Sequence, residues 1–324
     1  MELVDSIVLK GLRGVGDGTV TKLLEFSLRN DISTLEELAY VPVENLPLRR
    51  VPESLEEFLI AGDFEVARLA VDDNLRDWAN KGITVISRSS PQYPSRLLDL
   101  KDPPPFLFCK GNLALLDDSK AIAVVGTRNN TQRGKLIATK TVEAFNSHGF
   151  VVVSGLAIGI DTIAHRAALD CGAPTIAVLV DLLKISPSQN KLLAQEILEK
   201  GGLLVAENPP GTSTIAALFA KRDRIQSGLS TAVFAVETSK GGGTMHAVRA
   251  AVQLSRPVFV PDPIAARYDD LSLDAIEGTQ HLISEQIARA YTGQSYEAIS
   301  QELTAVADRI ENPRIPELQG GLGL

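Results

Sequence analysis

The sequence predicts an α/β protein whose main domain is an extended Rossmann-like fold, a doubly wound and mainly parallel sheet. Six short apolar runs rich in valine and isoleucine follow one another between residues 121 and 260. Each of the first five is followed by a segment in which apolar residues recur with helical spacing. Continuous apolar strands that alternate with helices indicate parallel strands covered by helices on both faces. The six runs are 121–125, 150–153, 175–179, 203–205, 231–236 and 257–260.

Two smaller regions precede this domain, which we place at residues 119–262. Residues 1–80 read as short helices separated by polar breaks, and they predict a small helical domain of the SAM or helix-hairpin-helix kind. Residues 81–118 form a connector that we expect to pack on the core. The connector holds a strand-like stretch at 83–86 and three consecutive prolines at 103–105.

The segment 263–324 is predicted to be an acidic, partly helical extension. Apolar residues at 283–310 have helical spacing, which predicts a short helical tail. The chain end, Gly320 to Leu324, is rich in glycine and is expected to be disordered.

Composition excludes several classes of protein. No stretch approaches the ~20 consecutive apolar residues that span a membrane, and the N-terminus is acidic where a signal peptide would be basic. We therefore expect a cytoplasmic protein without a membrane segment. The two cysteines, Cys109 and Cys171, lie far apart, and the four histidines form no recognisable ligand set. We expect neither a disulfide framework nor a metal or other cofactor.

The net charge of −8 is unevenly distributed along the chain. Residues 119–262 hold 15 basic and 10 acidic side chains, a net charge of +5, whereas the regions before and after carry −7 and −6. A basic middle between acidic ends indicates an anionic ligand for the middle. A solvated basic face would give the same count, so the charge alone does not decide between the two.

The loops that follow the strands are the places where chemistry is expected. In an open parallel sheet, ligands bind beyond the carboxyl ends of the strands, where helix N-termini attract anions. The first loop holds Gly126, Thr127 and Arg128. A glycine there lets a phosphate approach the backbone, and the arginine can hold it with two hydrogen bonds.

The second loop holds Ser154, Gly155 and Gly159 and runs into a helix that carries Asp161 and His165. Two glycines and a serine at a helix start again suit an anion. Asp161 and His165 share a helix face, but no third ligand is in view. We therefore expect both to have a structural role, with the carboxylate favourably placed near the helix N-terminus.

Two further loops add donors. Arg222 and Arg224 belong to the densest basic cluster of the chain, which also holds Lys221. After the fifth run, a glycine-rich loop opens a helix and exposes consecutive N–H groups to a phosphate. The residues of this loop are Lys240, Gly241, Gly242, Gly243 and Thr244.

The N-terminal region offers one more candidate contact. Gly14 and Gly16 lie in an apolar-x-Gly-apolar-Gly pattern that is typical of a helix-hairpin-helix. Two glycines permit a tight turn and expose backbone N–H groups that can bind a DNA phosphate. An ordinary helix–helix turn, packed for stability, would have the same pattern, and both interpretations stay open.

The order of these motifs resembles the DNA-processing protein A family, from about residue 70 to 262 and more loosely to the N-terminus. The most specific match is the stretch from Ser154 to His165. The other matching segments, in the order of the family, are 93–112, 126–128, 187–190, 207–211 and 222–225.

This resemblance implies an N-terminal helical domain, an extended Rossmann fold and single-stranded DNA as the ligand. It also implies the recombinase RecA as a partner, loaded onto DNA during natural transformation, and a homodimer formed through the Rossmann-like domain. The DNA contacts of the family correspond here to Arg128, Arg222 and Arg224, with Lys240 as a further candidate.

The chain departs from the family pattern at several positions. Ile158 stands where the family usually has arginine, and Asp223 where it has asparagine, so the site is more negative than usual. A Ser-Gly-Ser stretch is replaced by 241–243, Ala220 replaces a proline, and Asp262 replaces a glycine. The region past residue 283 does not resemble the winged-helix domain that some members carry.

Two other function classes remain as alternatives. A related Rossmann-like family senses nucleotides or nucleotide-derived signals, for instance in phage defence. Related phosphoribohydrolases have a similar glycine-rich loop but place a glutamate three residues after its threonine, where this chain has Ala247. Without that carboxylate no acid–base group is evident, and we predict that the protein is not an enzyme. A dinucleotide oxidoreductase is not favoured, because the GxGxxG fingerprint and its ribose-binding acidic residue are missing.

Overall fold

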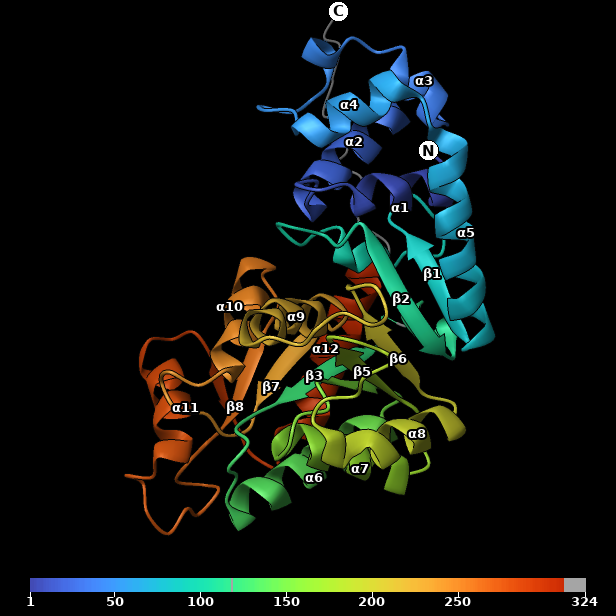
Figure 1. The fold of residues 1–324 in the computed structure, drawn as a ribbon. Helices are drawn as coiled ribbons and strands as arrows, with labels where there is room; N and C mark the ends of the chain where they lie inside the picture. The colour runs from blue at the N-terminus through green and yellow to red at the C-terminus, as the bar shows by residue number, and fades with distance from the viewer. Residues whose placement is uncertain (118, 312–324) are drawn as a thin grey trace, which may run out of the picture.

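The computed structural model describes residues 1–117 and 119–311, which form one nine-stranded sheet with helices on both faces and a helical unit at one end (Figure 1). The strand order is β1-β2-β6-β5-β4-β3-β7-β8-β9. The predicted fold class is confirmed. The strands are β1 (Ile83–Ser87), β2 (Phe106–Gly111), β3 (Ala121–Val125), β4 (Val151–Ser154), β5 (Thr175–Leu179), β6 (Leu203–Ala206), β7 (Ala232–Ala235), β8 (Val258–Pro261) and β9 (Arg289–Tyr291).

The sheet is parallel from β6 through β9, and antiparallel pairing occurs only at the edge formed by β1 and β2 within the described residues. The central strand β3 pairs with β4 on one side and β7 on the other. The chain therefore leaves β3 in one direction and returns to its other side later. Such a reversal opens a crevice at the carboxyl ends of the strands, where ligands bind in this class of sheet.

Every residue of the central strands is buried, because helices cover both faces of the sheet. Apolar side chains of β3, β7 and β8 alternate between two separate clusters, one on each face. One face is covered by α6 (Gln132–Ser147), α7 (Ile160–Asp170), α8 (Lys191–Glu199) and α12 (Tyr296–Glu311). The other is covered by α9 (Ala216–Gly228), α10 (Thr244–Gln253) and α11 (Asp274–Ser284).

The regions outside the Rossmann-like core contribute strands to the same sheet. The connector supplies β1 and β2, and the acidic extension supplies β9, so the sheet crosses both boundaries that we place at 118/119 and 262/263. The prediction of helical structure over 283–310 is partly wrong, because α11 ends at Ser284 and β9 precedes α12. A three-residue strand is too short to show an alternating pattern. The predicted disorder at 320–324 lies outside the described residues.

The N-terminal helices do not have a hydrophobic core of their own. Their buried leucines belong to one apolar cluster with Phe108 of β2 and residues of β5 and β6. Trp78 meets Phe108 edge-to-face at 5.3 Å between ring centroids. The helices are α1 (Leu3–Gly11), α2 (Asp17–Arg29), α3 (Leu35–Ala39), α4 (Glu53–Ala61) and α5 (Phe64–Asn80).

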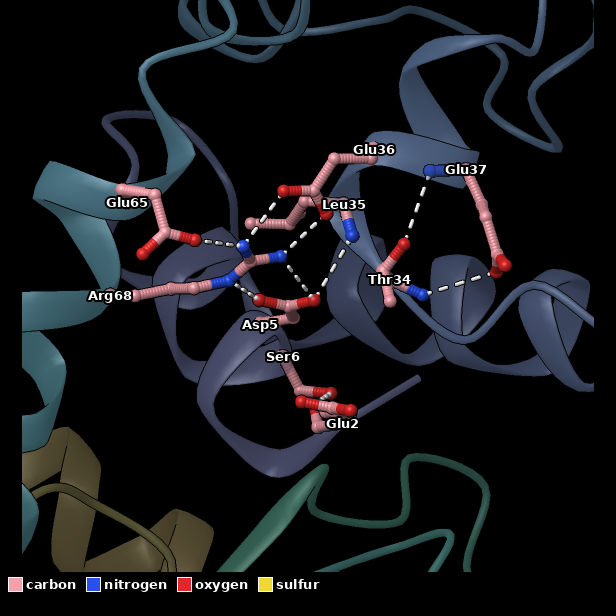
Figure 2. A network of polar contacts seen from close by, with 9 residues as sticks. All are labelled: Glu2, Asp5, Ser6, Thr34, Leu35, Glu36, Glu37, Glu65 and Arg68. Carbon is pink, nitrogen blue, oxygen red and sulfur yellow. Dashed lines mark hydrogen bonds and ion pairs between the residues drawn. The ribbon is translucent and has the colours of Figure 1, made fainter.

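One arginine ties three of these helices together (Figure 2). Arg68 of α5 contacts Asp5 of α1 at 2.7 Å and Glu36 of α3 at 2.6 Å. The Asp5 carboxylate is fully buried, and it also accepts a hydrogen bond from the backbone N–H of Leu35 at 3.0 Å. A buried carboxylate without a partner is costly, so this network fixes α1 and α3 relative to α5.

No helix in the described ranges, 1–117 and 119–311, combines the length and the apolar character that crossing a membrane requires.

Candidate functional site

A pocket of about 630 Å³ lies where the strand order reverses. It is bounded by the loops after β3, β4 and β7 and by one face of α9, which lies beside α10 (Figure 1). This volume is within the range of pockets that hold small molecules or single groups of a larger ligand. The predicted site residues in its wall are Gly126, Thr127, Arg128, Arg222, Gly242, Gly243 and Thr244, together with Asp161.

Arg222 is the buried cation of the pocket. Its side chain is 5% exposed, and its Nε lies 3.4 Å from Asp223 Oδ1. Nε and Nη1 make no hydrogen bond to any described residue. A buried guanidinium whose N–H groups lack acceptors is costly, and an anion in the pocket would satisfy them.

Gly155 leaves the space that this guanidinium occupies. A Cβ atom at position 155 would meet Arg222 Nη1, so no other residue fits there without displacing the arginine. Gly159 has a φ of +90°, and a Cβ on it would lie 2.4 Å from the carbonyl oxygen of Thr127. Ser154 is buried and donates to the Val124 carbonyl at 2.7 Å. These three residues shape the loops around the pocket and do not line it.

Asp161 and His165 are held by neighbouring groups of the fold. Asp161 Oδ2 accepts hydrogen bonds from the N–H groups of Gly155 and Ala157, at 3.2 and 3.3 Å. Burial raises the pKa of Asp161, and the nearby Arg222 acts against that rise. Burial lowers the pKa of His165 to about 3, and its Nδ1 lies 2.9 Å from Thr175 Oγ1 in β5. A neutral imidazole fixed in this way helps to attach α7 to the sheet.

Arg128 is the exposed cation of the pocket. It makes no hydrogen bond or ion pair with a described residue, and it also lines a smaller adjoining pocket of about 160 Å³. Arg222, Phe219 and Ile158 line that second pocket as well. Ile158 is 45% exposed, so the pocket has an apolar rim at this position.

The α10 end of the pocket offers backbone donors. Gly243 caps α10, and Thr244 begins it. The N–H groups of Met245 and His246 already donate to the carbonyls of Gly242 and Gly243, both at 3.0 Å. The donors left for a ligand are the N–H groups of Gly243 and Thr244, at the positive end of the helix dipole. Lys240 and Gly241 lie outside the pocket wall. The Lys240 side chain is 55% exposed and forms an ion pair with Glu277 of α11 at 3.4 Å.

Arg224 faces away from the pocket. Its two terminal nitrogens each lie 2.9 Å from one oxygen of Glu207, and Nη2 also donates to the Asp102 carbonyl at 2.9 Å. The Glu207 side chain is only 2% exposed. In this arrangement the guanidinium holds the loop after β6 and is not open to a phosphate.

Lys221 is engaged in the same network. Its Nζ lies 3.0 Å from Glu207 and 2.6 Å from Asp17, which also pairs with Lys10 at 2.6 Å. Burial acts to raise the pKa of Asp17, but the hydrogen bonds from Lys10 and Lys221 outweigh it and keep the pKa lowered. In the sequence Lys221 and Arg224 belong to a basic cluster. In the structure the carboxylates of Asp17 and Glu207 neutralise both of these cations.

Asp17 also positions the turn that carries Gly14 and Gly16 relative to α9. Gly14 has a φ of +79°, and Gly16 caps α2. The ion pair between Asp17 and Lys221 attaches this turn to α9. The turn does not line the pocket, and its role as a second DNA contact stays a prediction.

Several pocket residues were not predicted from the sequence. Phe219 and Gln226 lie with the predicted Arg222 on one face of α9, because residues three, four and seven apart share a helix face. That spacing could have identified them. His246 of α10 also lines the pocket. Within the described part of the chain, no three His, Cys, Asp or Glu side chains form a group that could hold a metal ion.

Comparison with curated proteins finds relatives named DNA processing protein DprA and Protein Smf. The chain is 37% identical to DNA processing protein DprA of Bacillus subtilis over 186 residues, which cover 57% of this chain and 62% of that protein. It is 40% identical to Protein Smf of Escherichia coli over 182 residues, which cover 56% of this chain and 48% of that protein. The chain thus spans about half to two thirds of the length of these relatives.

Comparison with solved structures finds proteins of the same name. DNA processing protein A from Streptococcus pneumoniae superposes with a TM-score of 0.76 and 29% identity, covering 92% of this chain and 98% of that one. The Helicobacter pylori protein of the same name gives a TM-score of 0.59 and 27% identity, covering 68% of this chain and 96% of that one. The family model described as DNA recombination-mediator protein A matches residues 84–304, which include β1 through most of α12. The chain therefore belongs to the DNA recombination-mediator protein A family.

Proposed function

We propose that this protein binds single-stranded DNA in the pocket at the strand reversal and acts as a recombination mediator. The observation that carries the proposal is the buried Arg222 guanidinium, whose Nε and Nη1 lack acceptors beside a pocket. The exposed Arg128 and the first turn of α10 supply further donors to the same space. A single-stranded DNA binding mode is described for the H. pylori relative, which supports the assignment.

The partners follow from the family and belong to the same proposal. We expect the protein to load RecA onto single strands, as in natural transformation, and to act as a homodimer in the cytoplasm. The DNA contacts proposed on structural grounds are Arg128, Arg222 and the loop 242–244. Lys240 and the turn at Gly14 and Gly16 are proposed as outer contacts, since they lie beyond the pocket.

The test measures affinity for single strands and for duplex of the same length, over a series of salt concentrations. We expect tighter binding of the single strand. Arg128→Ala should weaken it about tenfold and flatten the plot of log affinity against log salt by about 0.7, the value for one lost phosphate contact. The melting temperature should not change, because Arg128 is exposed. Lys200→Ala, an exposed charge at the opposite end of the sheet, is the control.

Arg224→Ala should give the opposite pattern. Removing this guanidinium leaves the buried Glu207 carboxylate with Lys221 alone, so the melting temperature should fall while the salt slope stays unchanged. A duplex bound as tightly as the single strand would contradict the proposal. So would an Arg128→Ala variant that binds single strands like the unmodified protein.

A nucleotide sensor is the second candidate, because the pocket is large enough for a small molecule. Free mononucleotides added to the same assay distinguish the two. Displacement of the single strand by micromolar mononucleotide would favour the sensor.

A further inference from the structure

Asp223 places an open hydrogen-bond acceptor inside the pocket. Its side chain is 16% exposed and lines the pocket wall. Oδ1 accepts a hydrogen bond from Gln226 Nε2 at 2.8 Å and lies 3.4 Å from Arg222 Nε. No described residue donates to Oδ2. An ionised carboxylate only accepts hydrogen bonds, so Asp223 has capacity for a donor from a ligand.

The other carboxylate of the pocket is already occupied. Asp161 Oδ2 receives two backbone N–H groups of its own loop, and the residue is 6% exposed. Asp161 therefore shapes the loop, and Asp223 is the acceptor that a ligand can reach.

The two carboxylates also determine where a phosphate can lie. A phosphate next to the free Oδ2 of Asp223 would be repelled, whereas Arg128, Arg222 and the first turn of α10 attract it. The group that contacts Asp223 must instead donate hydrogen bonds. In single-stranded DNA the donors are on the base edges, which are free of Watson–Crick partners.

Resting on the function proposed above, we propose that Asp223 makes the pocket prefer guanine among the four bases. Guanine is the base that presents two adjacent donors, N1–H and the 2-amino group. One donor can reach the free Oδ2 of Asp223, and the other can use the lone pair of Oδ1 that Gln226 leaves open. Adenine and cytosine present one amino donor beside a ring nitrogen acceptor. Thymine presents one N–H between two carbonyl oxygens. Both arrangements place an acceptor against the carboxylate, which is unfavourable.

The experiment compares oligonucleotides that differ at a few bases. A thymine-only strand is measured against strands in which every third thymine is replaced by guanine, inosine, adenine or cytosine, at pH 8, where Asp223 is ionised. Sparse guanines avoid folding of the strand. We expect the guanine strand to bind about tenfold more tightly than the thymine strand, the effect of one charge-assisted hydrogen bond. Inosine, which lacks only the 2-amino group, should lose most of this gain.

The matched variants are Asp223→Asn and Asp170→Asn. Asp223→Asn should bind all strands within about twofold of one another, because an amide has a single acceptor oxygen. Asp170 is exposed at the end of α7, away from the pocket, so Asp170→Asn should keep the guanine preference. Equal affinity of the unmodified protein for all strands, or a preference for adenine or cytosine, overturns the inference while leaving single-strand binding intact. Failure to bind any strand would instead refute the proposed function.

Discussion

At the scale of single residues, the pocket is electrically balanced and not simply basic. Two arginines, Arg128 and Arg222, face two aspartates, Asp161 and Asp223. Affinity for a phosphate then depends on where each charge points and on which carboxylates are already satisfied. Asp223 is decisive, because its carboxylate is not enclosed by backbone donors.

The pH dependence of stability should report on Asp223. Burial raises its pKa to about 6; Arg222 and Arg128 oppose that rise, and Asp161 adds to it. Between about pH 4 and 6 the folded state then binds more protons than the unfolded chain, so Asp223 destabilises the fold increasingly as the pH rises and fully above pH 6. Asp223→Asn should therefore raise the free energy of unfolding by roughly 1–3 kcal/mol at pH 8 and by less at pH 4.5.

The contribution of His165 to stability has the opposite pH dependence to that of Asp223. The two contributions overlap in the unmodified protein, so the Asp223 contribution has to be measured by comparing variants. Its pKa is about 3 in the fold, so the unfolded chain binds more protons between about pH 3 and 6.5 and stability is lost as the pH falls. Urea unfolding of the unmodified protein, Asp223→Asn and the exposed control Asp170→Asn at both pH values isolates the Asp223 contribution. A difference between Asp223→Asn and the unmodified protein that is the same at pH 4.5 and 8 would show that Asp223 does not titrate in this range.

At the scale of elements, the N-terminal helices and the sheet behave as one packed unit. They share an apolar cluster, and Trp78 of α5 rests on Phe108 of β2. Arg68→Ala should lower the free energy of unfolding by about 3–5 kcal/mol, because it leaves the buried Asp5 carboxylate without its cation. Because the core is shared, denaturant unfolding should remain a single transition at a lower midpoint.

Arg76→Ala is the control for this prediction. Arg76 lies on the same helix, but it is 74% exposed and its contact with Asp73 is 3.8 Å long. Its loss should change stability by less than about 0.5 kcal/mol. An early separate transition in Arg68→Ala would mean that the helical unit unfolds independently of the sheet.

The same scale explains what the sequence could and could not predict. The central strands were predictable because both of their faces are buried, which leaves continuous runs such as Ala121–Val125. The short β9 was missed because only one of its three residues is buried. Arg224 could not be assigned from the sequence, because its partner Glu207 is 17 positions away and meets it only after α9 packs on the sheet. Arg128 and Arg222 were found because a strand end and a basic cluster are local signals.

At the scale of the whole molecule, the position of the pocket at the strand reversal suits either binding or hydrolysis of a nucleotide. Cleavage of a nucleoside monophosphate needs an acid–base group beside the phosphate loop. Ala247 occupies the corresponding position, three residues after Thr244, and is buried. Of the two carboxylates that remain, Asp161 is held by backbone N–H groups, and Asp223 belongs to a different element, α9. We therefore expect no release of free base when the purified protein is incubated with adenosine or guanosine monophosphate and the products are separated by chromatography. Base released above a blank without protein, and lost in Asp223→Asn but retained in Asp170→Asn, would show that the pocket is an active site.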